Sequence, residues 1–178
     1  MIHPSEQATV LELDARRKLY DIVKRHAGCH FREIQRVAGL SFGSASYHLA
    51  YLQKHGLIKE TKDGNNRRYF PIQVDVQDEV FLMLLRQRSI RSILLFILTH
   101  EGCNHQEIST SVKLSSSTTT WHLKKLLEKA IIESMKNGKY NGYFLIVPKE
   151  RIMNLLICYK ESFVDELVDG LIELWETP

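Results

Sequence analysis

The chain has 178 residues, of which 44% are hydrophobic and 25% are charged, as in ordinary globular proteins. Its longest apolar run, residues 93–98, is far shorter than the roughly 20 residues that span a bilayer, so we expect no membrane segment. Residues 1–6 lack the basic and apolar stretches of a secretory signal, and the three cysteines are too few for a disulfide framework. These features favour a protein of the reducing cytoplasm.

The first half of the chain predicts two helices and a tight turn. One helix covers about residues 15–26 and ends near Gly28, where a left-handed residue can stop it. A shorter helix covers residues 31–38, and Gly39-Leu40-Ser41 forms the turn that follows. The hydroxyl of Ser41 is well placed to cap a third helix, because it can accept from the first free backbone N–H groups.

The third helix and a hairpin complete the predicted unit. Ala45, Leu49 and Leu52 have the i, i+4, i+7 spacing of an inward-facing helical stripe. Strands of about residues 58–62 and 68–72 flank a turn-forming stretch at residues 63–66. Three helices followed by a hairpin predict a winged helix-turn-helix.

The same pattern recurs 74 residues later. Between residues 17–74 and 91–148, 17 of 58 aligned pairs are identical without a gap. The second copy therefore predicts helices at about residues 88–100 and 105–112, a cap at Ser115, a third helix, and strands at about 132–136 and 143–147 around Asn137-Gly138. This internal repeat indicates two tandem domains of the same fold.

The segment after Pro148 does not belong to the repeat and is rich in apolar residues. Eight of the thirteen residues from 163 to 175 are apolar, and such a face requires a partner surface. We expect a helical segment that forms a homodimer through Phe163, Leu167, Leu171 and Trp175. The predicted architecture is mainly α with small β-hairpin wings (α+β). The first winged helix-turn-helix domain covers residues 1–74, and the second covers residues 75–147 and begins with a linker helix. A C-terminal helical dimerisation segment covers residues 148–178.

The net charge also differs between the two predicted domains and the C-terminal segment. Residues 1–76 carry a net charge of +4 and residues 77–147 one of +3, whereas residues 148–178 carry −4. Two basic units before an acidic tail point to a polyanionic partner for the first two parts only.

The cap, recognition helix and wing resemble those of the archaeal tandem winged-helix regulators related to the ArsR and MarR groups. The resemblance rests on residues 30–34, 40–49, 56–58 and 67–71, with 114–123 in the second copy, and it covers about residues 15–147. It implies a dimer that binds double-stranded DNA, with a recognition helix in the major groove and a wing on the backbone or minor groove.

In such a fold, the start of the recognition helix reaches base edges, and cationic side chains hold phosphates. The residues expected to contact DNA in the first copy are Ser41, Phe42, Gly43, Ser44, Ser46, Tyr47, Tyr51, Lys62, Asn66, Arg67 and Arg68. Those expected in the second are Ser115, Ser116, Ser117, Thr118, Thr120, Trp121, Lys124, Lys125 and Lys139. Because side chains alternate along a strand, one of Arg67 and Arg68 should face DNA and the other the sheet.

Two alternatives remain open. Tandem winged helices could serve as a protein-interaction adaptor that contacts the transcription machinery. A metal- or thiol-responsive site could instead form at His26, Cys29 and His30, and at His100, Cys103 and His105. A buried structural cysteine explains each motif as well. No activated nucleophile, phosphate-binding glycine loop or paired acidic site occurs in the sequence, and we expect no cofactor, no metal and no catalysis.

Overall fold

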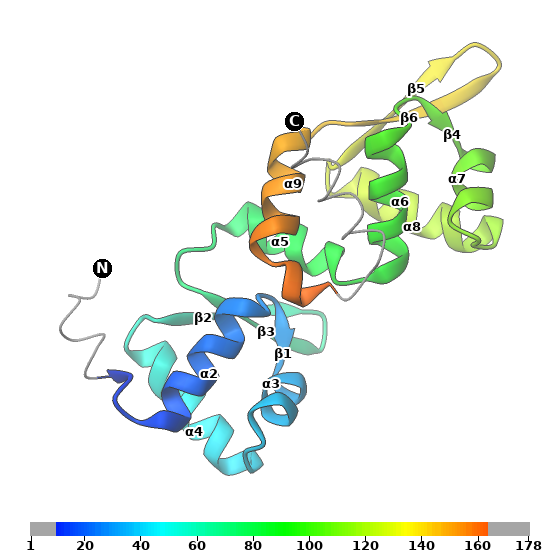
Figure 1. Ribbon diagram of the computed structural model, residues 1–178. Coiled ribbons are helices and arrows are strands. Elements are labelled where there is room, and N and C mark those ends of the chain that lie inside the picture. Colours follow the sequence, from blue (N-terminus) through cyan, green and yellow to red (C-terminus); the bar gives the residue numbers. More distant parts are fainter. Residues whose placement is uncertain (1–9, 164–178) are drawn as a thin grey trace. The chain divides into compact units, whose positions relative to one another are not determined.

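The computed structural model describes residues 10–163 and divides the chain into two compact units between Met83 and Leu84. Each unit repeats the same order of elements (Figure 1). The first contains α2 (Asp14–Arg25), β1 (Cys29–His30), α3 (Phe31–Ala38), α4 (Phe42–Lys54), β2 (Ile58–Asp63) and β3 (Asn66–Pro71). The second contains α6 (Arg88–Thr99), β4 (Cys103–Asn104), α7 (His105–Ser111), α8 (Ser116–Glu128), β5 (Ile132–Asn137) and β6 (Tyr140–Leu145). The two winged helix-turn-helix folds are thus confirmed.

Three further elements flank these units. The helix α5 (Val76–Leu85) contains the division between the units, and α9 (Lys149–Cys158) is followed by the short 3-10 helix η1 (Lys160–Ser162). The helix α9 buries one apolar face, formed by Ile152, Met153, Leu155 and Leu156. No helix within residues 10–163 has the length and apolar character to cross a membrane.

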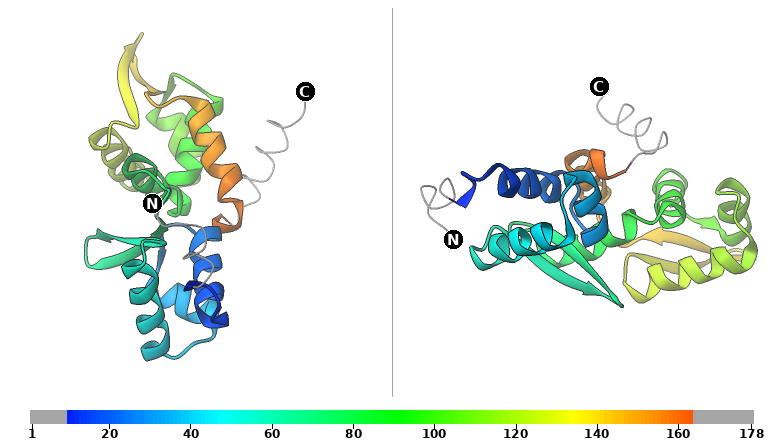
Figure 2. Two further views of the ribbon diagram at one scale, coloured as in Figure 1. Left: turned by 90° about the vertical axis from the view of Figure 1, so that its left-hand side faces the viewer. Right: turned by 90° about the horizontal axis from the view of Figure 1, so that it is seen from below.

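Apolar stripes of the helices form the core of each unit. In the first, Leu19 and Val23 of α2, Ile34 of α3 and Leu49 and Leu52 of α4 are buried in one cluster. The helix α2 packs on both α3 and α4, and the hairpin β2–β3 extends beyond the helices (Figure 2). The inward stripe read from the i, i+4, i+7 spacing is confirmed, because Ala45, Leu49 and Leu52 are the buried residues of α4.

Each wing belongs to a three-stranded antiparallel sheet rather than to an isolated hairpin. The order is β1-β3-β2 in the first unit and β4-β6-β5 in the second, with Cys29 opposite Tyr69 and Cys103 opposite Tyr143. The sequence did not indicate β1 or β4, because a strand of two residues is too short to show alternation.

The second hairpin differs from its sequence prediction. Its second strand begins at Tyr140 rather than Tyr143, and Asn137 pairs with Tyr140 across a two-residue turn. Gly138 in this turn has a φ of +63°, which is the left-handed conformation that tight hairpin turns require. Residues 140–142, which the predicted strand bounds left in the turn, therefore belong to β6.

Candidate nucleic-acid interface

Serine caps fix the start of both recognition helices. Ser41 accepts from the backbone N–H of Ser44 at 3.2 Å, and Ser115 accepts from that of Thr118 at the same distance. Both capping predictions are confirmed. The caps set where α4 and α8 begin, and so which side chains their first turns present.

The first turns of α4 present an exposed face of small and aromatic side chains. Phe42 is 68% exposed and Tyr47 61%, and Gly43 and Ser46 are also exposed. A methyl group at Gly43 would meet no atom within 4 Å. The Phe42 ring lies 4.9 Å from that of Phe31, centroid to centroid, which positions it at the helix start. This face can pack on thymine methyl groups and hydrogen-bond to base edges.

A groove joins this helix face to the wing. It has a volume of about 760 Å³, and its lining includes Phe42 and Ser46 of α4, Asn66 and Arg67 of the wing, and Arg32 of α3. The structure thus brings residues of α4 together with wing residues that lie 20 or more positions later in the sequence. Arg32, also exposed, was missed by sequence reasoning, because only the packing of α3 against α4 places it beside the recognition helix.

Arg67 and Arg68 leave β3 on opposite sides, as alternation predicts. Arg67 is exposed and its Nε lies 3.5 Å from the Oε1 atom of Glu60. Arg68 is only 7% exposed, and it donates to Asp63 at 2.6 Å and to the Gly28 carbonyl at 2.9 Å. Arg68 therefore ties the sheet together, which corrects the expectation that it contacts DNA.

The outer end of the first wing is basic. Lys62 of β2 is paired directly with Arg67 of β3, and both side chains are exposed. Like charges at directly opposed positions destabilise a hairpin, so this pairing favours a bound polyanion. Asn66, also exposed, begins β3 next to them.

Tyr51 is positioned by the first unit's own side chains. The guanidinium of Arg16 lies 3.7 Å from the centroid of the Tyr51 ring, and the ring of His55 is 4.3 Å away. The side chain is half-buried, and Ser44 is half-buried as well. The exposed reading face of α4 is thus Ser41, Phe42, Gly43, Ser46 and Tyr47.

The helix α8 presents a similar but more internally bonded surface. Trp121, at the position of Tyr47, is 59% exposed, and Ser116, Ser117 and Lys124 are exposed beside it. The hydroxyl of Thr120 donates to the Ser116 carbonyl at 2.9 Å and lies 3.0 Å from His105 Nε2. The Ser115 hydroxyl lies within 3.1 Å of those of Ser117 and Thr118, so these groups partly satisfy one another.

Cations are placed differently in the second unit. Lys125 is half-buried, and its Nζ donates to Gln87 Oε1 at 3.4 Å. Lys124 Nζ lies 3.9 Å from Glu128 Oε1. Lys139 is exposed in the hairpin turn, and the cross-strand pair equivalent to Lys62 and Arg67 is Lys136 and Asn141. At this cross-strand pair the second wing therefore has one cation where the first has two.

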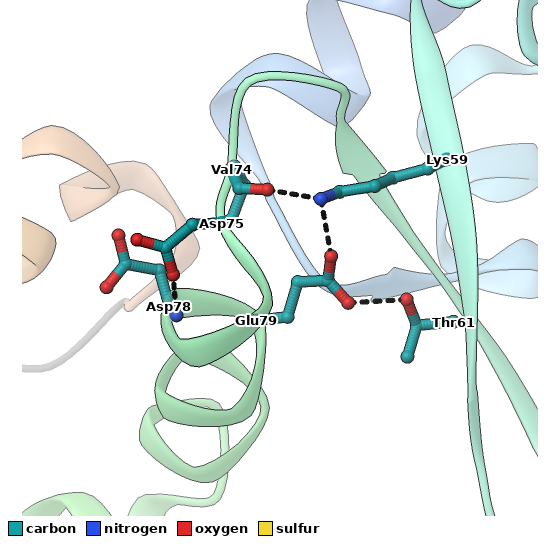
Figure 3. Close-up of polar contacts among 6 residues, drawn as sticks. All are labelled: Lys59, Thr61, Val74, Asp75, Asp78 and Glu79. Atoms are coloured by element: carbon teal, nitrogen blue, oxygen red, sulfur yellow. Dashed lines mark hydrogen bonds and ion pairs between the residues drawn. The ribbon is translucent and has the colours of Figure 1, made fainter.

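A buried ion pair connects the first wing to α5 (Figure 3). The Glu79 carboxylate lies 2.6 Å from Lys59 Nζ and accepts from the Thr61 hydroxyl at 2.5 Å, and Lys59 also donates to the Val74 carbonyl. Because Glu79 is buried, these bonds replace the water that its charge would otherwise require. They fix the base of strand β2 on the helix that follows the wing.

Both cysteines of the repeat and His122 are buried, whereas His26 and His48 are half-buried and His100 is exposed. Burial lowers the pKa of His122 below the ordinary value, with Lys125 adding to the shift, and its Nδ1 atom is buried without a hydrogen-bond partner. Burial raises the pKa of Cys103 to about 11, and Cys29 is fully buried. Within residues 10–163 no three His, Cys, Asp or Glu side chains gather as a metal site would require.

Three of the four residues expected at a dimer seam, Leu167, Leu171 and Trp175, lie outside the described residues. Phe163 is described and is 2% exposed, with the guanidinium of Arg91 located 5.5 Å from its ring centroid. Its side chain therefore belongs to the core of the second unit.

Each unit matches a known family. An N-terminal HTH domain family matches residues 13–82, and a winged helix-turn-helix DNA-binding family matches residues 86–133. The uncharacterized HTH-type transcriptional regulator MJ1398 of Methanocaldococcus jannaschii is 29% identical over 140 residues, which are 79% of this chain. The chain spans only 35% of that relative's length.

A bacterial relative is matched over most of its own length. The uncharacterized HTH-type transcriptional regulator YyaN of Bacillus subtilis is 32% identical over 121 residues, which cover 60% of this chain and 86% of the relative.

Proposed function

The chain belongs to the HTH-type transcriptional regulators, and we propose that it is a sequence-specific, dimeric regulator that reads double-stranded DNA mainly through its first winged helix. In this proposal α4 enters the major groove, and the β2–β3 wing holds the backbone or the adjacent minor groove. The resemblance of its winged-helix motifs to those of the ArsR and MarR groups supports the further proposal that it is related to them.

The groove between α4 and the wing is the observation that carries this proposal. It combines an exposed apolar and hydroxyl-bearing helix start with Arg32 and Arg67. Arginine binds phosphate through two parallel hydrogen bonds, and small residues at the helix start allow close approach to the bases. Because none of the exposed residues on the reading face is Arg, Asn or Gln, sequence-dependent DNA shape should supply much of the specificity.

The second unit plays a supporting part in this proposal. Trp121 and Lys139 add contacts, but the opposed cation pair of the first wing is absent from the second. Dimerisation through Leu167, Leu171 and Trp175 would double the number of reading helices and favour a pseudo-palindromic site.

The test is duplex binding by the full chain, using fragments selected from the source genome and fluorescence anisotropy at several salt concentrations. We expect affinity to fall steeply with salt. Tyr47→Ala should weaken binding about tenfold, the loss of about 1.4 kcal/mol. Tyr140→Ala removes an equally exposed aromatic ring from the second unit and should have a smaller effect.

Two results would contradict the proposal. Salt-insensitive or absent duplex binding would favour the protein-interaction adaptor instead. A mass near the 20.7 kDa of one chain in light scattering would exclude the dimer.

A further inference from the structure

The second unit has a cavity that lies apart from both the recognition face and the wing. It has a volume of about 540 Å³, within the range of small-molecule sites. One face of α6 forms one wall, and the turn between α7 and α8 forms the other. The lining residues are Arg88, Ser89, Ser92, Leu95, Phe96, Thr99, Ser111, Val112, Lys113 and Leu114.

The lining has an apolar part and a cationic part. Leu95, Phe96, Val112 and Leu114 provide the apolar surface, while Arg88 and Lys113 are exposed cations. No carboxylate lines the cavity, and neither cation forms an ion pair with another side chain among residues 10–163. The hydroxyls of Ser89, Ser92 and Ser111 supply further hydrogen-bond donors. This combination suits a small organic carboxylate with an apolar body.

Comparison with the first unit shows that these properties are specific to the second copy. In the first copy, the residues aligned with Arg88, Ser92 and Leu95 are Asp14, Lys18 and Asp21, respectively. Lys113 replaces Gly39, and it keeps the left-handed backbone with a φ of 54° against 66° for the glycine. A lysine in this conformation costs about 1 kcal/mol relative to glycine. The second copy thus bears a strained cation where the first has none.

We propose that this cavity binds a small organic carboxylate as an effector. The ligand's apolar body would lie against Leu95 and Phe96, and its carboxylate would be neutralised by Arg88 and Lys113. Leu114 lines the cavity and directly precedes the Ser115 cap of α8, so an occupied cavity can shift the start of the second recognition helix. Only this last step rests on the proposed DNA-binding function.

Calorimetric titration of the full chain without DNA tests the site independently of that function. The probes are benzoate, 3-phenylpropanoate and octanoate, with 3-phenylpropanamide as the uncharged analogue. We expect the best carboxylate to bind with a Kd of about 1 mM or lower, as its size allows. The amide should bind at least tenfold more weakly, because it lacks the charge.

Two variants identify the residues. Lys113→Gly restores the residue of the first copy and relieves backbone strain, so it should fold well but bind the carboxylate about tenfold more weakly. Lys129→Gly removes the same charge from the far end of α8, outside the cavity, and should leave the Kd unchanged. Failure of all three carboxylates to bind, equal binding of acid and amide, or unchanged binding by Lys113→Gly would each overturn the proposal. If a carboxylate binds but duplex affinity does not respond, the site stands and its coupling to α8 is wrong.

Discussion

Arg67 and Arg68 are neighbours in sequence but have opposite environments, since Arg67 is exposed at the wing and Arg68 is buried against Asp63 and the Gly28 carbonyl. The alternation of a β-strand produces this difference. One arginine is available to a ligand, while the other connects β3 to the loop before β1. Substitution of each should therefore affect a different property.

Arg67→Ala should weaken duplex binding across sequences and lower the salt slope by about one unit, with little change in stability. Arg68→Ala should instead reduce the free energy of unfolding by about 1–3 kcal/mol, because the Gly28 carbonyl and Asp63 lose their partner. Anisotropy titrations and urea unfolding separate the two effects. Lys24→Ala, an exposed cation on α2, is the control for charge alone. Equal effects of Arg67→Ala and Lys24→Ala on the salt slope would remove the wing from the interface.

The second copy has a left-handed alanine, Ala130, where the first copy has Gly56, with φ values of 51° and 61°. Ala130→Gly should raise the stability of the second unit by about 1 kcal/mol, because glycine adopts this conformation without strain. Gly56→Ala is the matched reverse change and should destabilise by a similar amount. Thermal unfolding of both variants checks the pair. Destabilisation by Ala130→Gly would show that the larger chain entropy of glycine in the unfolded state outweighs the relief of strain.

Glu79→Gln should lower the free energy of unfolding by about 1–3 kcal/mol, because Lys59 loses its charge partner in a largely buried site. Glu128→Gln disrupts only an exposed pair with Lys124 and should change stability by less than about 0.5 kcal/mol. Chemical denaturation measures both. The double variant Lys59→Met with Glu79→Leu should recover much of the loss, since no buried charge then lacks a partner. A loss in the double variant larger than in Glu79→Gln would contradict this account.

Stability should fall as the pH drops below about 6.5, because the buried His122 has a lowered pKa in the folded protein. The unfolded chain then binds the proton more readily than the folded one, so acid favours unfolding. His122→Leu should flatten this dependence, and at neutral pH it should cost little, since it removes a buried Nδ1 that has no partner. Denaturation midpoints from pH 5 to 8 provide the measurement, with the exposed His100→Gln as control. An unchanged profile in His122→Leu would assign the acid sensitivity to other groups.

The sequence alone determined the two helix-turn-helix units, because their signals are local. The serine caps, the helical stripe of Ala45, Leu49 and Leu52, and the glycine-containing hairpin turns each act over a few residues, and each kind of signal occurs in both copies. The alternation of a strand likewise predicted that only one of Arg67 and Arg68 would face outward.

Only the tertiary structure decided which of the candidate residues share a surface. Tyr51 lies under Arg16, Arg32 joins the groove beside Arg67, and Glu79 reaches Lys59 from a helix that the sequence predicts separately. The short strands β1 and β4 exist because a neighbouring strand offers them partners, not because of their own residues. Contacts between distant segments depend on how the elements pack, and no local spacing in a single sequence encodes them.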